Sequence, residues 1–142
     1  MRELKFDVAG MPVTQGSKRL VNRNTNYAHI IDDNDKRLAP WRALVSHEAH
    51  LATAAGGGMF LKKTAICLVI TFILPRPASD PKRRFPVTKP DLDKLVRAVK
   101  DSLTKVAYWD DSQVVEMHVI KRFPRGAPWY GAHIAVTERA EP

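Results

Sequence analysis

Residues 64–74 limit how this chain can fold more than any other segment, because nearly all of them are apolar or β-branched. Such an unbroken run is typical of a central strand that is covered on both faces, whereas a strand with one wet face alternates. Pro75 follows directly and ends the strand, since proline has no N–H for a sheet ladder. We therefore expect a sheet built around this strand.

Hydrophobic periodicity and turn formers divide the rest of the chain into strands, loops and helices. We expect strands over 3–8, 114–123 and 132–137, a loop with a short hairpin over 10–39, and helices over 40–55 and 92–106. The predicted fold class is α/β (α+β), with a mixed central sheet of about four to five strands and two main helices packed on it. One domain spanning residues 1–142 is expected.

Charge makes nucleic acid the first partner to consider. Lysine and arginine number 23 against 15 acidic residues, a formal net charge of +8, and a polyanion is the natural partner of such a chain. Cys67 is the single cysteine, which excludes an intrachain disulfide, and we expect no cysteine-based zinc site. No segment resembles a signal peptide or a membrane span, so we expect a cytoplasmic protein without a membrane partner or an organic cofactor.

Acidic residues near the second helix suggest a metal site. Asp91 and Asp93 lie where a loop enters the helix, and their carboxylates can converge because the first residue there is still extended. Asp110 and Asp111 precede the next strand. If that strand pairs beside residues 64–74, Asp111 returns to the end of the sheet where the helix starts. Three carboxylates would then hold Mg²⁺, which stabilises a phosphodiester transition state and lowers the pKa of a bound water.

These aspartates also have a simpler explanation, in which Asp91 or Asp93 is only a helix cap and the pair at 110–111 only a turn. The preceding loop favours the metal site. Residues 75–90 contain five prolines and five cations against one carboxylate, a net +4 that is half of the chain's excess. A purely structural cap rarely lies beside so concentrated an attractor of phosphate, although such a charge run can also be a solvated surface.

We predict that cations of this loop and its surroundings contact DNA. They are Lys18, Arg19, Arg76, Lys82, Arg83, Arg84, Lys89 and Lys94. His118 and His133 fall within predicted strands and have no assigned role.

Three motifs together resemble the RusA family of Holliday junction resolvases, in particular its phage-type members. They are Lys-Pro-Asp-Leu-Asp-Lys-Leu at 89–95, Asp-Ser-Leu at 101–103 and Trp-Asp-Asp-Ser-Gln-Val-Val at 109–115. The family's core reads roughly as basic-x-Asp-Leu-Asp-Asn-Leu, a helix ending in Asp-Ala-Leu, then Asp-Asp-Ser-Gln-Val. Residues 10–19 and 39–42 add weaker similarity.

The resemblance implies a homodimer that resolves four-way junctions and related branched DNA by paired symmetric nicks. It implies Mg²⁺, with Mn²⁺ as a substitute, at Asp91, Asp93 and Asp111, and Asp110 is the alternative to Asp111. Lys94 stands where the family usually has asparagine.

Arg97 stands where the best-known members have an essential lysine, one helical turn past Asp93, so we predict a catalytic role for it. Arginine can stabilise the charge of a transition state, but it cannot act as a base because it keeps its proton. The simpler alternative for Arg97 is an i, i+4 ion pair with Asp93.

Other functions stay open at this point. One is a less selective nuclease that acts on flaps, forks or plain duplex. Another is a DNA-binding protein without catalysis, in which the aspartates only cap and brace. An RNA-processing enzyme is a third, although the sequence has no motif for reading 2′-hydroxyls.

Overall fold

The computed structural model describes residues 1–16, 18–22, 28–32 and 36–140 of the chain. Its elements in chain order are β1 (Glu3–Ala9), β2 (Lys18–Asn22), β3 (Ala28–Asp32), α1 (Leu38–Ala55), β4 (Ile66–Ile73), α2 (Leu92–Leu103), a 3₁₀ helix (Asp111–Gln113), β5 (Val114–Arg122) and β6 (Gly131–Glu138).

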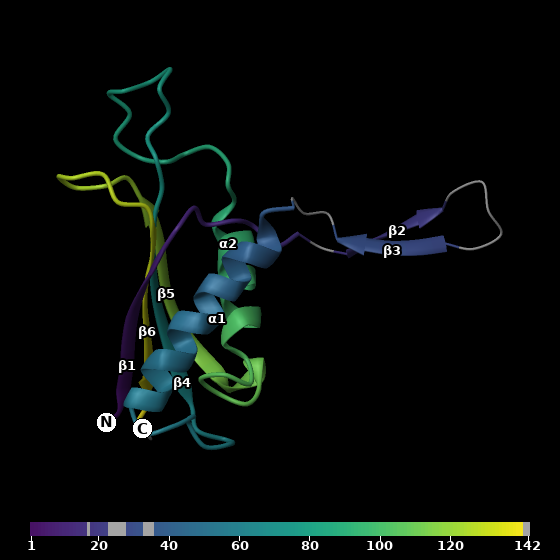
Figure 1. Cartoon of the computed structure of the whole chain (residues 1–142), viewed down its shortest axis with the longest axis vertical. Coiled ribbons are helices and arrows are strands. Elements are labelled where there is room, and N and C mark those ends of the chain that lie inside the picture. Colours follow the sequence, from purple (N-terminus) through teal and green to yellow (C-terminus); the bar gives the residue numbers. More distant parts are fainter. Residues whose placement is uncertain (17, 23–27, 33–35, 141–142) are drawn as a thin grey trace.

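Four strands form one mixed sheet in the order β1-β6-β4-β5. β4 pairs parallel with β5 and antiparallel with β6, and β1 pairs antiparallel with β6. β2 and β3 form a separate two-stranded sheet that extends away from the rest of the domain (Figure 1). The predicted class, a mixed sheet with two helices in an α+β domain, is confirmed, and so is the interior place of the apolar strand.

Both helices pack on the same face of the sheet (Figure 1). The crossovers β1-α1-β4 and β4-α2-β5 each join parallel strands, and both step in the same direction across the sheet. Because such crossovers have the same handedness, both helices lie on one side of the sheet. The core lies between the two helices and the sheet, and it includes Leu68 and Phe72 of β4, both fully buried.

The other face of the sheet is covered by no helix or strand in the part of the chain that the structure describes. Val69 of β4 is 40 % exposed on this face, and Ile120 of β5 is 52 % exposed. The expectation that the apolar strand is covered on both faces is therefore wrong. We call this surface the open face of the sheet.

The helix boundaries differ from the predicted ones for local reasons. α1 begins at Leu38, so that Pro40 lies within the first turn, where a missing N–H costs no helical hydrogen bond. α2 ends at Leu103, before the predicted Val106. Lys105 has a φ of 65°, a left-handed conformation that a right-handed helix cannot contain. No helix among the described residues is long and apolar enough to cross a membrane.

Gly131, at the start of β6, has a φ of 153°, and a Cβ there would lie 2.0 Å from the carbonyl oxygen of Val8. We expect Gly131→Ala to lower the free energy of unfolding by about 2–4 kcal/mol, because backbone strain and a clash act together. The control is Gly126→Ala, at a φ of 82° with open space around it, which should cost only about 1 kcal/mol. Urea denaturation measures both losses, and equal losses would contradict the packing argument.

Candidate active site

The start of α2 presents two carboxylates to solvent. Asp91 is the N-cap residue, with an extended backbone at φ −70° and ψ 133°, but its side chain makes no capping hydrogen bond. Its nearest charged partner is the Nζ of Lys94, 3.9 Å from Oδ2, and 52 % of the Asp91 side chain is exposed. Asp93 lies in the first turn of the helix. A capping role therefore does not account for Asp91.

Asp110, in contrast, is a true cap. Its Oδ1 accepts hydrogen bonds from the backbone N of Ser112 at 2.9 Å and from the Ser112 hydroxyl at 2.7 Å. Together with Gln113, it forms a capping box on the 3₁₀ helix. The backbone hydrogen bond from Ser112, followed by the hydroxyl, holds the pKa of Asp110 below its ordinary value. The simpler explanation thus applies to Asp110.

Gln113 fixes this segment with a buried side chain whose hydrogen bonds are satisfied at both ends. Its Oε1 accepts from the backbone N of Trp109 at 2.9 Å and of Asp110 at 3.0 Å. Its Nε2 donates to the carbonyls of Leu61 at 2.9 Å and Thr64 at 3.0 Å, just before β4. The turn that carries Asp111 is therefore tied to the start of the central strand.

Asp111 is held differently from its neighbour. Its Oδ2 lies 3.2 Å from the Nζ of Lys100 on α2. Its Oδ1 is buried and makes no hydrogen bond of ordinary geometry in the described part of the chain, and the same is true of the Tyr108 hydroxyl, which lies close to Asp111. Burial, and then the charge of Asp111, raise the pKa of Tyr108. An unpaired buried carboxylate oxygen is costly, so this atom is suited to bind a cation.

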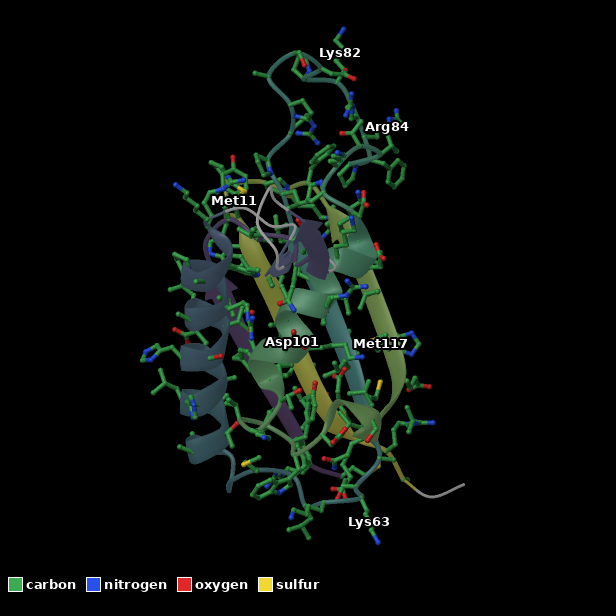
Figure 2. All side chains as sticks on the ribbon, turned by 90° about the vertical axis from the view of Figure 1, so that its right-hand side faces the viewer. Met11, Lys63, Lys82, Arg84, Asp101 and Met117 are labelled. Carbon is green, nitrogen blue, oxygen red and sulfur yellow. The ribbon has the colours of Figure 1, made fainter. Side chains whose placement is uncertain are left out.

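A cavity of about 500 Å³ lies between α2 and β5 and joins several of these side chains. Asp93, Arg97, Lys100, Asp101 and Asp111 supply its charged groups, and the apolar part of its lining includes Met117 of β5 (Figure 2). Asp93, Arg97 and Lys100 follow one another at i, i+4 and i+7, which places them on one face of α2. Sequence reasoning did not single out Lys100, and it used Asp101 only as part of the motif at 101–103.

Asp91 lines a second cavity instead, about 560 Å³ in volume, between the N-terminal segment and the loop before α2. The expectation that Asp111 returns to the start of α2 is wrong in one respect. β5 runs parallel to β4, so its first residues lie at the end of the sheet where α2 ends. Lys100, the partner of Asp111, is two helical turns, roughly 10 Å, past Asp93.

Two of the three predicted metal ligands, Asp93 and Asp111, thus share a cavity, and Asp91 borders the neighbouring one. Within the described ranges, the three do not form a group whose ligand atoms lie within 4.8 Å of one another. Their chemistry still fits Mg²⁺, because all three donors are hard carboxylate oxygens and one oxygen of Asp111 is buried without a partner. The metal site remains a prediction.

The cations of the loop at 75–90 divide into two groups. Arg83 donates to Asp80 Oδ2 at 3.0 Å and to Thr88 Oγ1 at 3.1 Å, and Arg76 donates to the carbonyl of Arg83 at 2.8 Å. These two side chains brace the loop. Lys82 and Arg84 lie near the tip of the loop, far from the sheet (Figure 2), and both are exposed, as is Lys89.

Lys121 of β5 is a cation that sequence reasoning missed, because its only signal is a place in a predicted strand. Its Nζ donates to the carbonyls of Thr88 and Pro90, both at 2.8 Å. It therefore anchors the loop immediately before Asp91. Lys18 and Arg19 begin β2, and their side chains lie outside the described part of the structure.

Carboxylates at the end of a basic loop, beside a cavity with further cations, are the arrangement expected of a protein that acts on nucleic acid. Comparison with known proteins agrees. The chain matches the family described as "Endodeoxyribonuclease RusA" over residues 9–137. It is also 33 % identical over 128 residues to an uncharacterized protein, YqaN of Bacillus subtilis strain 168, with 83 % of this chain and 86 % of that protein covered. The chain belongs to the RusA endodeoxyribonuclease family.

The different partners of Asp110 and Asp111 predict opposite effects on stability. Asp110→Ala removes a cap and should lower the Tm. Asp111→Asn removes the charge of a side chain that is 47 % exposed but has one buried, unpaired oxygen, and it should leave the Tm unchanged or raise it when measured in EDTA. Thermal unfolding followed by circular dichroism measures both. A loss of stability in Asp111→Asn as large as in Asp110→Ala would show that Asp111 is structural.

Proposed function

We propose that this chain is a Mg²⁺-dependent endodeoxyribonuclease that resolves four-way junctions and related branched DNA, with residues 1–142 acting as one domain. The buried, unpaired Oδ1 of Asp111, in a cavity shared with Asp93, is the observation that carries this proposal. Membership of the RusA family supports it, and so does the basic loop that ends at Asp91.

Asp91, Asp93 and Asp111 would hold one or two ions, since Asp93 and Asp111 share one cavity and Asp91 borders the neighbouring one. Magnesium bound there supplies Lewis-acid stabilisation of the scissile phosphate and a water of lowered pKa. Mn²⁺ has the same preference for oxygen ligands and would substitute. Hydrolysis leaves 5′-phosphate and 3′-hydroxyl ends.

Arg97 follows Asp93 by one helical turn on the rim of the same cavity, together with Lys100. Its guanidinium can grip a phosphate in bidentate fashion and offset the negative charge that develops during cleavage. Because the guanidinium keeps its proton, Arg97 contributes charge and orientation without serving as a base. Lys100 holds Asp111 Oδ2 at 3.2 Å and so positions that carboxylate.

The exposed cations Lys82, Arg84 and Lys89 would contact phosphates around the branch point. Such contacts follow the DNA backbone and carry no base information, which favours selection by shape over sequence. A four-way junction is nearly two-fold symmetric. A homodimer with one site in each protomer would place one nick on each of two opposed strands.

The central test is cleavage of a synthetic four-way junction by the wild type, by Asp91→Asn and by Asp111→Asn. We expect cleavage in Mg²⁺, none in EDTA, and a loss of at least about 100-fold in each variant, as is typical when a group that stabilises the transition state is removed. Asp7→Asn, on the open face of the sheet, is a matched control that should retain activity. Unchanged activity in Asp91→Asn and Asp111→Asn would overturn the proposal.

The same assay separates the rival functions. Equal rates on the junction and on its component duplex would indicate a nuclease without selectivity for branches. Tight binding of the junction without cleavage in Mg²⁺ or Mn²⁺ would indicate a DNA-binding protein. For paired nicks, a plasmid that extrudes a cruciform should be converted directly to linear DNA, whereas accumulation of a nicked circle would argue against a coupled dimer.

Arg97 gives a prediction of its own. Arg97→Ala should lower the cleavage rate by about 100- to 1,000-fold, because a charge opposite the developing negative charge is lost. Arg97→Lys keeps the charge but loses the bidentate grip, so its rate should fall by roughly tenfold, well short of the loss in Arg97→Ala. Both rates are measured from pH 6 to 9. Near wild-type activity in Arg97→Ala would reduce Arg97 to an ion-pair partner of Asp93.

A further inference from the structure

Three side chains with different ligand atoms meet on the open face of the sheet. They are Cys67 of β4 and Glu116 and His118 of β5, and one ligand atom from each lies within 4.8 Å of the other two. The Nε2 of His118 is 3.7 Å from Oε2 of Glu116. Among the described residues, this is the one group of three or more possible metal ligands that are so close together.

The pairing of the two strands creates this cluster. The register between β4 and β5 shifts between Ile66 and Cys67, so that Cys67 lies opposite Glu116, and His118 follows two residues later on the same face. Leu68, the next residue after Cys67, points to the opposite side and is buried in the core under the helices. The cluster is therefore separated from the cavity of Asp93 and Asp111 by the sheet itself.

We propose that Cys67, Glu116 and His118 form a zinc site in which protein side chains supply three ligands and the fourth position is open to water. A thiolate, an imidazole and a carboxylate are the three ligand types that Zn²⁺ takes in proteins. Ligand atoms around a tetrahedral zinc are roughly 3.3–3.8 Å apart, given bond lengths of about 2.0–2.3 Å. Atoms within 4.8 Å need only small side-chain rotations to reach that arrangement.

This site revises the expectation that a single cysteine leaves no cysteine-based zinc site, because histidine and glutamate complete the ligand set. Arg139, whose Nε lies 3.5 Å from Glu116 Oε2, would orient the ligating carboxylate from outside, as such partners do in metal sites. Its charge also opposes the approach of a cation, so the thiolate must supply the compensating negative charge.

The thiol must lose its proton for the sulfur to bind zinc. Burial, followed by Glu116, raises the pKa of Cys67 to about 11, so the thiol is protonated at neutral pH without an ion. Binding transfers that proton to water as the zinc–sulfur bond forms. The bound ion then joins β5, the edge strand of the sheet, to the interior strand β4 by a link that is independent of their backbone hydrogen bonds.

Cobalt(II) gives a direct test, because its bond to a thiolate produces a near-ultraviolet charge-transfer absorption and this chain has only one cysteine. The full chain, free of any histidine tag, is titrated with Co²⁺ in excess Mg²⁺, a hard cation that does not compete for sulfur. We expect the band to saturate at one ion per chain and to disappear when Zn²⁺ is added. Zn²⁺ should also raise the Tm.

Variants of the ligands complete the test. Cys67→Ser should abolish the band. The His118 side chain is 67 % exposed, so His118→Gln should not unfold the domain. His118→Gln should weaken binding by more than the roughly 10- to 100-fold that the loss of an outer-shell partner costs. His133→Gln, an exposed histidine on β6, is the matched control and should bind as the wild type does. No band in the wild type, wild-type affinity in His118→Gln, or one ion per two chains would each overturn the proposal.

Discussion

Four hydrogen bonds from the buried side chain of Gln113 decide where the acidic turn lies. They join the backbone of Trp109 and Asp110 to the carbonyls of Leu61 and Thr64, so they connect the entry of β5 to the entry of β4. Parallel strands share no tight turn, and their relative register has to be set by contacts of this kind. The position of Asp111, and the start of the edge strand, follow from this one amide.

Local patterns were enough to locate the principal elements of the fold. The apolar run and the helical spacing after Leu92 are signals that neighbouring residues create among themselves, and β4 and α2 appear where these signals predict them. Local patterns could not predict which faces of the sheet are covered. That coverage depends on β6, the last strand of the chain, inserting between β1 and β4, and on both crossovers stepping in one direction. The exposure of Val69 is a consequence of that order.

The candidate site was predictable to a similar extent. The helix start identified Asp91 and Asp93. The sequence could not show which of the neighbours Asp110 and Asp111 is the cap, because that depends on which carboxylate the 3₁₀ turn directs to Ser112. The unpaired oxygen of Asp111 became visible only with the side chains in place. The zinc ligands likewise depend on a shift in strand register, which no spacing along the chain encodes.

Lys121 gives the loop at 75–90 a mechanical property that its proline-rich composition does not suggest. By holding the carbonyls of Thr88 and Pro90, it clamps the last residues of the loop to the sheet, while the tip with Lys82 and Arg84 extends away from it. The end of the loop next to Asp91 is thus fixed to the sheet. Contacts that a bound partner makes with Lys82 and Arg84 at the tip therefore need not displace the carboxylate of Asp91, which follows the residues that Lys121 holds.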